Sequence, residues 1–289
     1  TGTSFVSHAY TADLGLSAWE LDLFGRLRNL EDQALQQYLA TEETHRAVRL
    51  SLIAEVSTAY MTLAAGNEQL ALARSTLRSR QDAYALQRRL FDEGDATELT
   101  VRQAQSEMEA ARDQALALES TVATDRNALE LLAGTPLPAD LRPAPLDSLL
   151  SMRNVPAGMP SDLLQRRPDI LSAEHTLIGA NANIGAARAA FFPRITLTGS
   201  FGLASDSLSS LFEGGNRAWS FAPQLTLPIF NGGRLAANLN MAKTDRDIAV
   251  ANYERSIQSA FREVADTLAV RAKLDDRLSA QQRRVEALR

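Results

Sequence analysis

Residues 217–235 read RAWSFAPQLTLPIFNGGRL, and this stretch changes its hydrophobic period part-way along. Up to residue 229, apolar side chains alternate with small or polar ones, which is the two-residue period of a β-strand. Beyond the Asn-Gly-Gly turn signal, proline is absent and apolar residues recur at three- and four-residue steps, as in a helix. The stretch therefore predicts a strand that leads directly into a long helix.

Two more stretches alternate in the same way, one over residues 194–203 and one near the start of the chain. The loop at 204–217 is expected to join the last two strands as a hairpin. A transmembrane barrel strand needs roughly 10 residues of such alternation and a polar lumen face. A strand covering the core of a soluble sheet has the same pattern, so the alternation alone leaves both interpretations open. The residues expected to face lipid in a barrel are Ile195, Leu197, Phe201, Trp219, Phe221 and Leu225.

Proline placement leaves two long segments free to be helical, because all ten prolines lie from Pro136 to Pro228. Over residues 26–133 and again after residue 234, the apolar spacing is typical of coiled-coil seams. One turn interrupts the first segment, where Gly94 is expected to form a left-handed C-cap and Asp95 or Thr97 to cap the return helix. The prediction is a helical hairpin whose first arm, residues 26–91, is roughly 100 Å long.

The middle of the chain has a different character. Residues 134–165 are rich in proline and predict a small irregular α/β region, followed by a helix that opens at Pro168. That helix carries many small residues, which allow another helix to approach closely. An internal repeat relates Leu23–Leu27 to Ile229–Leu235, with two residues inserted in the second copy. Each copy follows an alternating strand and opens a long helix, so we predict a duplicated strand–helix unit.

Composition excludes several classes of protein. The 289 residues carry a net charge of −5 and include no cysteine, which excludes a disulfide framework, a Cys-ligated metal and a thiol nucleophile. The acidic balance argues against nonspecific nucleic-acid binding. No apolar run is long enough for a transmembrane helix. His8, His45 and His175 are expected on a strand and two helices without metal-ligand spacing, so we predict no catalysis, metal or cofactor.

The group Arg166-Arg167-Pro168-Asp169 lies where the middle helix is expected to open. Two interpretations of this group stay open. It can bind an anion at the helix N-terminus, or it can form a helix cap together with salt bridges between domains. Asn231-Gly-Gly-Arg234 lacks the Lys-Ser/Thr of a phosphate loop and is interpreted as a turn before a helix.

The stretch from Pro160 to Ile170, PSDLLQRRPDI, continues into Ala180-Asn-Ala and Phe192-Pro193. It closely resembles the outer-membrane factor family of TolC/OprM-like multidrug efflux channels, in the RND-associated (NodT-like) branch. The junctions of that family resemble Trp19–Arg26 and Phe230-Asn-Gly-Gly. Its first periplasmic tip resembles Phe91-x-x-Gly94 followed by Leu99.

The resemblance implies a mixed α and β membrane protein with a TolC-like fold. A long antiparallel α-helical barrel and transmembrane β-barrel strands assemble in this fold as a homotrimer. Strands are then expected over 1–24 and 193–230, helical barrel over 26–133, 168–190 and 234–289, and an equatorial α/β region over 134–167. Each subunit of such a trimer supplies four strands, and three are recognisable. We therefore expect the chain to be an internal portion of a longer protein, incomplete at both ends.

The resemblance also implies the function of a passive exit duct. Such a duct lies in the outer membrane of a Gram-negative bacterium, projects into the periplasm and conducts drugs or other small toxic compounds. Its implied partners are the lipid bilayer, a periplasmic adaptor (membrane fusion protein) and an inner-membrane RND transporter, with no nucleic acid. The implied partner-binding tip comprises Phe91, Asp92, Gly94, Asp95, Thr97 and Leu99. The implied strand-to-helix junctions contain Phe24, Gly25, Phe230, Gly232 and Gly233.

Two alternatives stay open from the sequence. A periplasmic coiled-coil adaptor or scaffold also carries a long helical hairpin, although its hairpin is flanked by compact β-domains. A type I protein-secretion exit duct shares the fold and differs in its partners. Both predict helices of this length, so the hairpin alone does not separate them from an efflux duct.

Overall fold

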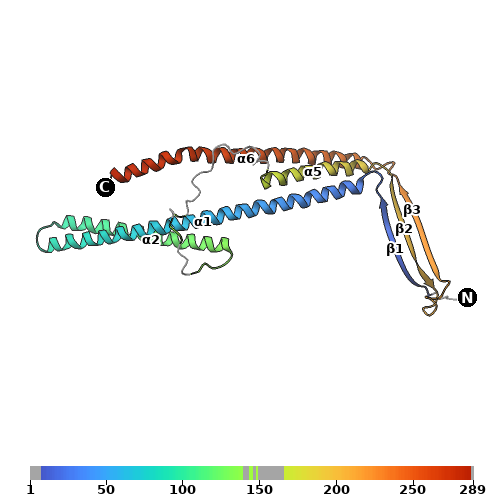
Figure 1. Ribbon diagram of the computed structural model, residues 1–289, viewed down its shortest axis with the longest axis horizontal. Helices are drawn as coiled ribbons and strands as arrows, with labels where there is room; N and C mark the ends of the chain where they lie inside the picture. The colour runs from blue at the N-terminus through green and yellow to red at the C-terminus, as the bar shows by residue number, and fades with distance from the viewer. Residues whose placement is uncertain (1–7, 139–142, 146–147, 149–165, 288–289) are drawn as a thin grey trace. The chain divides into compact units, whose positions relative to one another are not determined.

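The computed structural model describes residues 8–138, 143–145, 148 and 166–287. Its elements follow in the order β1 (Tyr10–Leu21), α1 (Arg26–Asp92), α2 (Glu98–Ala133), α5 (Pro168–Ala189), β2 (Arg194–Ser205), β3 (Arg217–Thr226) and α6 (Arg234–Ala287) (Figure 1). The chain divides into two compact units, residues 1–45 with 161–289 and residues 46–160, and the boundary falls within α1. In the described part of the chain, no helix combines the length and apolarity needed to cross a membrane.

The three alternating stretches form one antiparallel sheet in the first unit, in the order β1-β2-β3. β2 and β3 are a hairpin, as predicted. Directly paired residues of neighbouring strands share a face of a sheet. Phe201 pairs with Leu14 of β1 and with Trp219 of β3, so all three side chains lie on one face. The register therefore gathers the apolar residues of the three strands on one side.

β1 contains a bulge that the alternation does not reveal. Leu16 and Trp19 pair with residues 199 and 197 of β2, so the two residues between them oppose Thr198 alone. One of these two, Ala18, has a left-handed φ of 51°, and its N–H donates to the Thr198 hydroxyl at 3.2 Å. An extra residue of this kind shifts the alternation by one position. Leu16 and Trp19 therefore share a face although they are three residues apart.

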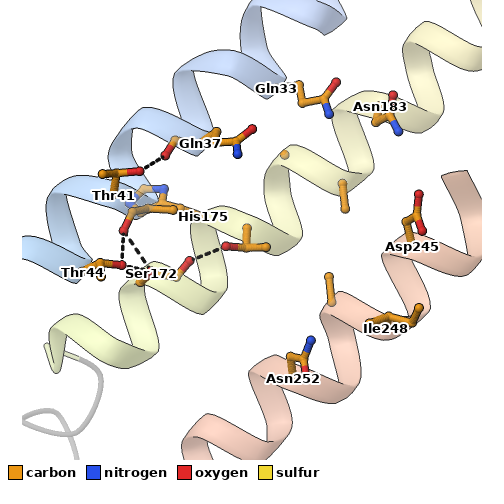
Figure 2. A pocket seen from close by; sticks show the side chains of 15 residues that line it. Gln33, Gln37, Thr41, Thr44, Ser172, His175, Asn183, Asp245, Ile248 and Asn252 are labelled. Carbon is orange, nitrogen blue, oxygen red and sulfur yellow. Dashed lines mark hydrogen bonds between the residues drawn. The ribbon is translucent and has the colours of Figure 1, made fainter. Parts of the chain in front are cut away.

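In the first unit, α5 lies between α1 and α6 (Figure 2). Pro168 occupies the start of α5, as predicted. Small residues of α5 allow α1 to come close. A Cβ added at Gly179 would lie 3.4 Å from Cβ of Gln36, and one added at Gly185 would collide with the side chain of Asn29. This packing agrees with the prediction that small side chains permit a close helix contact.

In the second unit, α1 and α2 form the predicted antiparallel hairpin (Figure 1). Gly66 lies at the contact, because a Cβ there would be 3.3 Å from Cγ2 of Val122. Ion pairs bridge the two helices between Arg74 and Glu119 and between Arg80 and Glu107, both at 2.7 Å. Exposed pairs of this kind add at most about 1 kcal/mol each. The hairpin therefore depends mainly on apolar residues at the contact, which include Leu63, Leu70, Val101, Met108, Ala115 and Leu129.

The predicted coiled-coil seams are only partly covered by this single chain. Leu63 is 2% exposed where α2 packs on α1, but Tyr38 and Leu52 of the same helix are 66% and 43% exposed. On α6, Phe261 and Leu268 are also about half exposed. Apolar stripes of this kind normally face another helix. The single chain thus leaves apolar helix surface that a further protein surface would cover.

The predicted equatorial region at 134–167 falls mostly outside the described residues, as do Pro160–Gln165 of the sequence that resembles the outer-membrane factors. At its start, Gly134 has a left-handed φ of 67°, and its N–H donates to the carbonyl of Leu131 at 3.3 Å. The side chain of Arg126 then donates to the carbonyl of Pro138 at 2.7 Å. These contacts end α2 and hold the following residues against it.

Candidate functional site: the strand face, the junctions and the helical tip

The apolar face of the sheet is open to the surroundings in this chain. Leu14, Trp219 and Phe201, which form one row across the strands, are 88%, 76% and 63% exposed. The residues predicted to face lipid all lie on this face, namely Ile195, Leu197, Phe201, Trp219, Phe221 and Leu225. Glycine at 199 leaves a shallow groove between neighbouring side chains. An exposed apolar patch that extends across three strands marks contact with an apolar partner or a membrane.

The opposite face of the sheet is small and polar. The Ser200 and Ser220 hydroxyls lie 2.8 Å apart across β2 and β3. Thr196 pairs with Gln224 on one side and with Glu20 on the other. A sheet with one apolar and one polar face separates two environments, as barrel strands between lipid and a water-filled lumen do.

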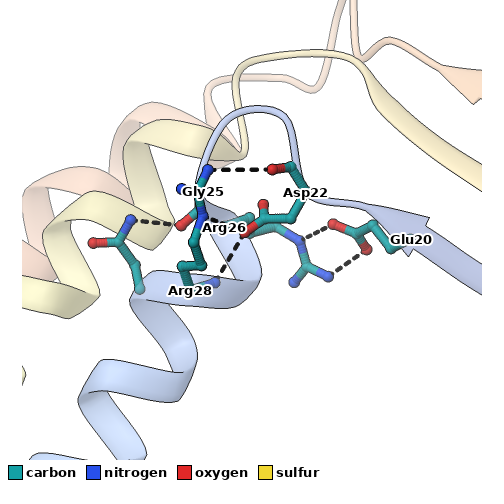
Figure 3. A network of polar contacts seen from close by, with 6 residues as sticks. Glu20, Asp22, Gly25, Arg26 and Arg28 are labelled. Carbon is teal, nitrogen blue, oxygen red and sulfur yellow. Dashed lines mark hydrogen bonds and ion pairs between the residues drawn. The ribbon is translucent and has the colours of Figure 1, made fainter.

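A cluster of charges holds the first strand-to-helix junction together (Figure 3). Glu20 of β1 accepts two hydrogen bonds from Arg26 of α1, at 2.8 and 2.6 Å. The same carboxylate forms an ion pair at 2.8 Å with Arg194, the first residue of β2. Its side chain is 9% exposed. One half-buried carboxylate therefore ties β1, α1 and β2 to each other, which sequence reasoning missed because Arg194 is far away along the chain.

Asp22 caps the start of α1 (Figure 3). Its carboxylate accepts from the backbone N–H of Arg28 at 3.0 Å and lies 3.4 Å from Nε of the same residue. The hydrogen bond from this backbone N–H, together with the guanidinium, lowers the pKa of Asp22 below its usual value. Gly25 makes the turn between Asp22 and the helix with a left-handed φ of 75°. A residue with φ in this range is normally glycine.

The aromatic residues predicted at the junctions have different surroundings. Phe24 stacks on Phe192, with ring centroids 4.6 Å apart and an angle of 12° between the planes. Phe230 is 90% exposed in this chain. Gly232 and Gly233 both have left-handed φ values, 61° and 84°, at the turn into α6. The structure therefore places all five predicted junction residues at the two turns between strand and helix.

The predicted tip residues all lie in or beside the turn between α1 and α2. Gly94 has φ 91°, and the backbone forms the two bonds of a Schellman cap. Asp95 N–H donates to the Leu90 carbonyl at 2.8 Å, and Gly94 N–H donates to that of Phe91 at 3.0 Å. The Thr97 hydroxyl then caps α2 by accepting from the N–H of residue 100 at 3.3 Å. Both predicted caps are present, with Thr97 rather than Asp95 at the N-cap.

The surface of this turn is mostly exposed. Phe91 and Leu99 are 37% and 68% exposed. Asp92 lies 3.5 Å from Arg88 in an i,i+4 pair, and Asp95 adds a further acid. An exposed turn of this kind has apolar surface that a partner can bury and acidic groups that a partner can pair with. The partner-binding role of these residues remains a prediction.

Arg167 lies at the start of α5, in the group for which the sequence allows either a bound anion or a helix cap with salt bridges. Its guanidinium binds Asp169 at 2.8 Å and Glu263 of α6 at 2.8 Å. These bonds raise the pKa of Arg167, and the Arg167 guanidinium lowers the pKa of Asp169. The group therefore forms a salt bridge between α5 and α6, as part of the second interpretation expected. The rest of that interpretation is wrong, because the Arg167 side chain makes no capping bond and both helices belong to one unit.

The histidines do not form a site. β1 begins at Tyr10, where its pairing with Ser205 starts, so the prediction that His8 lies on a strand is wrong. Nδ1 of His175 lies 2.7 Å from the Gln36 side-chain oxygen, at the edge of a polar groove of about 470 Å³ along α5 (Figure 2). Within the described residues, no group of three or more His, Cys, Asp or Glu side chains has metal-binding geometry.

The geometry agrees with a comparison of the chain with protein families. The family described as outer membrane efflux protein matches residues 1–135 and 159–289. The chain belongs to the outer membrane efflux protein family. This membership confirms the resemblance to outer-membrane factors and the TolC-like fold. It also gives the outer membrane as the location of the protein. It agrees with the prediction of no catalytic activity, because the family description names an efflux protein and not an enzyme.

Relatives of this outer membrane efflux protein carry matching names. It is 48% identical over 288 residues to the probable efflux pump outer membrane protein TtgC of Pseudomonas putida. It is 49% identical over 286 residues to outer membrane protein OprJ of Pseudomonas aeruginosa. In each case the match covers 99% of this chain and 59% of the relative. The chain thus spans about three-fifths of the length of these relatives.

Solved structures show the same fold. CusC, described with reference to transmembrane channel formation, superimposes with a TM-score of 0.89 at 41% identity, covering 100% of this chain and 67% of the other. The open state of the Neisseria gonorrhoeae outer membrane channel MtrE superimposes with a TM-score of 0.88 at 40% identity, covering 99% of this chain and 65% of the other. This outer membrane efflux protein therefore shares its backbone arrangement with known channels.

The contacts of Glu20 with Arg26 and Arg194, here called the Glu20 clamp, lead to a testable expectation about stability. Glu20→Gln keeps the size of the side chain but leaves Arg26 and Arg194 facing each other without a negative charge. We expect this loss to cost about 1–3 kcal/mol. The measurement is the temperature at which the purified protein unfolds in detergent. Glu213→Gln, at an exposed acid of the β2–β3 loop, is the matched control. Equal shifts for both variants would contradict the clamp.

Proposed function

We propose that this protein is the outer-membrane exit duct of a tripartite, RND-type efflux pump. It conducts drugs or other small toxic compounds passively to the cell exterior. The observation that carries the proposal is the two-sided sheet joined directly to helices of 67 and 54 residues, in a chain of the efflux family. The apolar face supports lipid contact, and the polar face supports a water-filled path. Helices of this length support a conduit that extends away from the membrane.

The proposed partners are a periplasmic adaptor and an inner-membrane RND transporter. The exposed turn from Phe91 to Leu99 is the proposed contact with them. Its Schellman cap fixes the direction in which the turn leaves α1, and its exposed apolar residues provide contact area. TtgC carries an efflux-pump name, which supports a role beside other pump components.

We further propose that the protein works as a homotrimer. β1 and β3 each pair with β2 alone among the described strands, so each has an open edge. Open edges and exposed apolar seams promote association with further protein surface. Association with neighbouring copies would pair the open strand edges and cover the apolar helix seams.

The trimer proposal predicts that no stable folded monomer exists. Light scattering combined with circular dichroism of the purified protein should show helical signal only in the oligomer. Dilution should lead to loss of structure or to aggregation rather than to a helical monomer. A monodisperse monomer with full helical signal would overturn the proposal.

The duct function is tested in cells. Deletion of the gene should raise the intracellular level of an exported dye such as ethidium and lower drug resistance. The intact gene supplied on a plasmid should restore both. An unchanged dye level and unchanged resistance in a strain that lacks other outer-membrane factors would contradict the function.

Family membership favours the duct over an adaptor or scaffold, and detergent extraction provides a direct check. A protein with lipid-facing strands should remain in the membrane pellet until detergent is added. Release by salt or alkaline carbonate would favour a scaffold. The exported compounds distinguish an efflux duct from a protein-secretion duct, because a secretion mutant would retain a protein rather than a dye.

A further inference from the structure

The ends of the three strands and the start of α6 surround a cavity of about 300 Å³. Three arginines line it: Arg26, Arg194 and Arg234. Thr226, the partner of Arg194 across β2 and β3, also lines it and lies on the polar face of the sheet. Two carboxylates also line it, Glu20 and Asp22, and each is already paired with an arginine. Apolar residues form much of the remaining wall, among them Leu21, Leu23, Phe24, Phe192 and Leu235. The cavity therefore combines three arginines and two paired carboxylates with an apolar lining.

The cavity has more hydrogen-bond donors than acceptors. Glu20 accepts from Nε and one terminal nitrogen of Arg26 and pairs with Nε of Arg194. Arg194 uses Nε in this ion pair, and its side chain is 55% exposed, so its terminal nitrogens are open to solvent or to a ligand. Among the residues that the structure describes, no acidic side chain pairs with Arg234. A guanidinium has five N–H donors and no acceptor, so an anion is the group that would satisfy the excess.

The internal repeat shows what the second junction lacks. In the first copy, Arg26 at the start of α1 binds Glu20, six residues earlier. The second copy has two inserted residues, so Arg234 corresponds to Arg26 and Thr226 corresponds to Glu20. The first junction thus supplies its own carboxylate, whereas the second has a neutral hydroxyl at that position. Asn231, which is also neutral, caps α6 through the N–H of Leu235 at 3.3 Å.

We propose that this cavity is a binding site for an organic anion, whose carboxylate or sulfonate takes the place that Glu20 occupies in the first junction. Arg234 and the terminal nitrogens of Arg194 bind the charged group. The aromatic and aliphatic lining holds an apolar body. Because the polar face of the sheet faces the water-filled path in the proposed duct, the inference rests on the proposed function. It adds a class of ligand, namely compounds with an anionic head and an aromatic body.

The test uses the purified oligomer in non-ionic detergent and equilibrium dialysis with naphthoate. Its neutral analogue naphthamide has nearly the same shape, and micelles without protein give the background. Wild-type protein should bind naphthoate at least about tenfold more tightly than naphthamide, because the charge-assisted bonds need the carboxylate. Equal binding of the two compounds would overturn the proposal.

Substitutions locate the site. Thr226→Glu supplies the carboxylate of the first junction and should weaken naphthoate binding at least about tenfold, while Thr226→Gln should not. Arg234→Gln and Arg194→Gln should also weaken it. Arg217→Gln removes the same charge at the other end of β3 and should bind as the wild type does. Oligomer formation of every variant is checked on a gel.

Several results would overturn the proposal. In the first, Thr226→Glu and Arg234→Gln both bind naphthoate as tightly as the wild-type protein does. In the second, Arg217→Gln loses as much naphthoate affinity as Arg234→Gln does. In the third, no variant binds naphthoate, and a phospholipid that co-purifies with the protein is lost from Arg234→Gln, which would assign the cavity to a lipid phosphate. Failure of naphthoate binding with normal dye export in cells would reject this site and leave the duct function standing.

Discussion

Phe201→Arg is expected to prevent assembly into the outer membrane, whereas Ser200→Arg at the neighbouring position is expected to be tolerated. Phe201 lies in the middle of β2, between Leu14 and Trp219 on the open apolar face. An arginine near the midplane of a bilayer costs about 2–4 kcal/mol in each subunit. Three copies in a trimer would multiply the penalty. Ser200 faces the other side of the sheet, where a charged group can stay in water.

The measurement is the amount of oligomer in isolated outer membranes, judged by a gel without heating, and the drug resistance of the same cells. Ser200→Arg loses the hydroxyl contact to Ser220, which costs about 1 kcal/mol. It therefore serves as a matched control for the introduced charge. Equal assembly of both variants would contradict the assignment of the apolar face to lipid.

Gly94→Val is expected to abolish drug resistance while leaving the oligomer intact. Gly94 has φ 91°, and a Cβ added there would meet no atom of this chain within 4 Å. The expected effect is therefore one of backbone conformation. A β-branched residue is strongly disfavoured at positive φ, so the turn should change its shape and move Phe91 and Leu99 relative to each other. In the proposed trimer, assembly depends on the sheet and the helix seams and not on this turn.

Gly94→Asn provides the control, because asparagine tolerates the left-handed conformation far better than valine does. Cells carrying Gly94→Asn should retain most of their resistance and normal crosslinking to the adaptor. Cells carrying Gly94→Val should lose both at an unchanged level of oligomer. Normal crosslinking in Gly94→Val, or a loss of oligomer that matches the loss of resistance, would reject the turn as the contact.

Local chemistry made much of this fold predictable. The glycine at position 94 and the threonine at 97 specify the two caps of the hairpin turn, since each acts within a few residues of itself. The alternation in β2 and β3 likewise specifies which side chains share a face. The bulge before Trp19 was not predictable, because it exists only relative to the register of β2. The clamp between Glu20 and Arg194 was missed for the same reason, since both contacts join distant parts of the chain.

The site residues divide in the same way. The turn from Phe91 to Leu99 could be located from glycine placement. A glycine that ends a helix in the left-handed conformation allows the chain to reverse its direction, and Gly94 has this role. The cavity around Arg234 could not be located from its own sequence. It becomes visible when the second junction is compared with the first, where Glu20 fills the place of Thr226.

The pairing of β1 with β2 also has a consequence for how the chain acquires its fold. Ala18 and Thr198, which meet at the bulge, are 180 residues apart, whereas Ser200 and Ser220 in the hairpin are 20 apart. Contacts between residues so distant along the chain form slowly, because the loop between them must close first. The β2–β3 hairpin should therefore form early and β1 should join late. Until then the apolar strands stay exposed and prone to aggregation, so nascent chains should depend on chaperones that shield them on the way to the membrane.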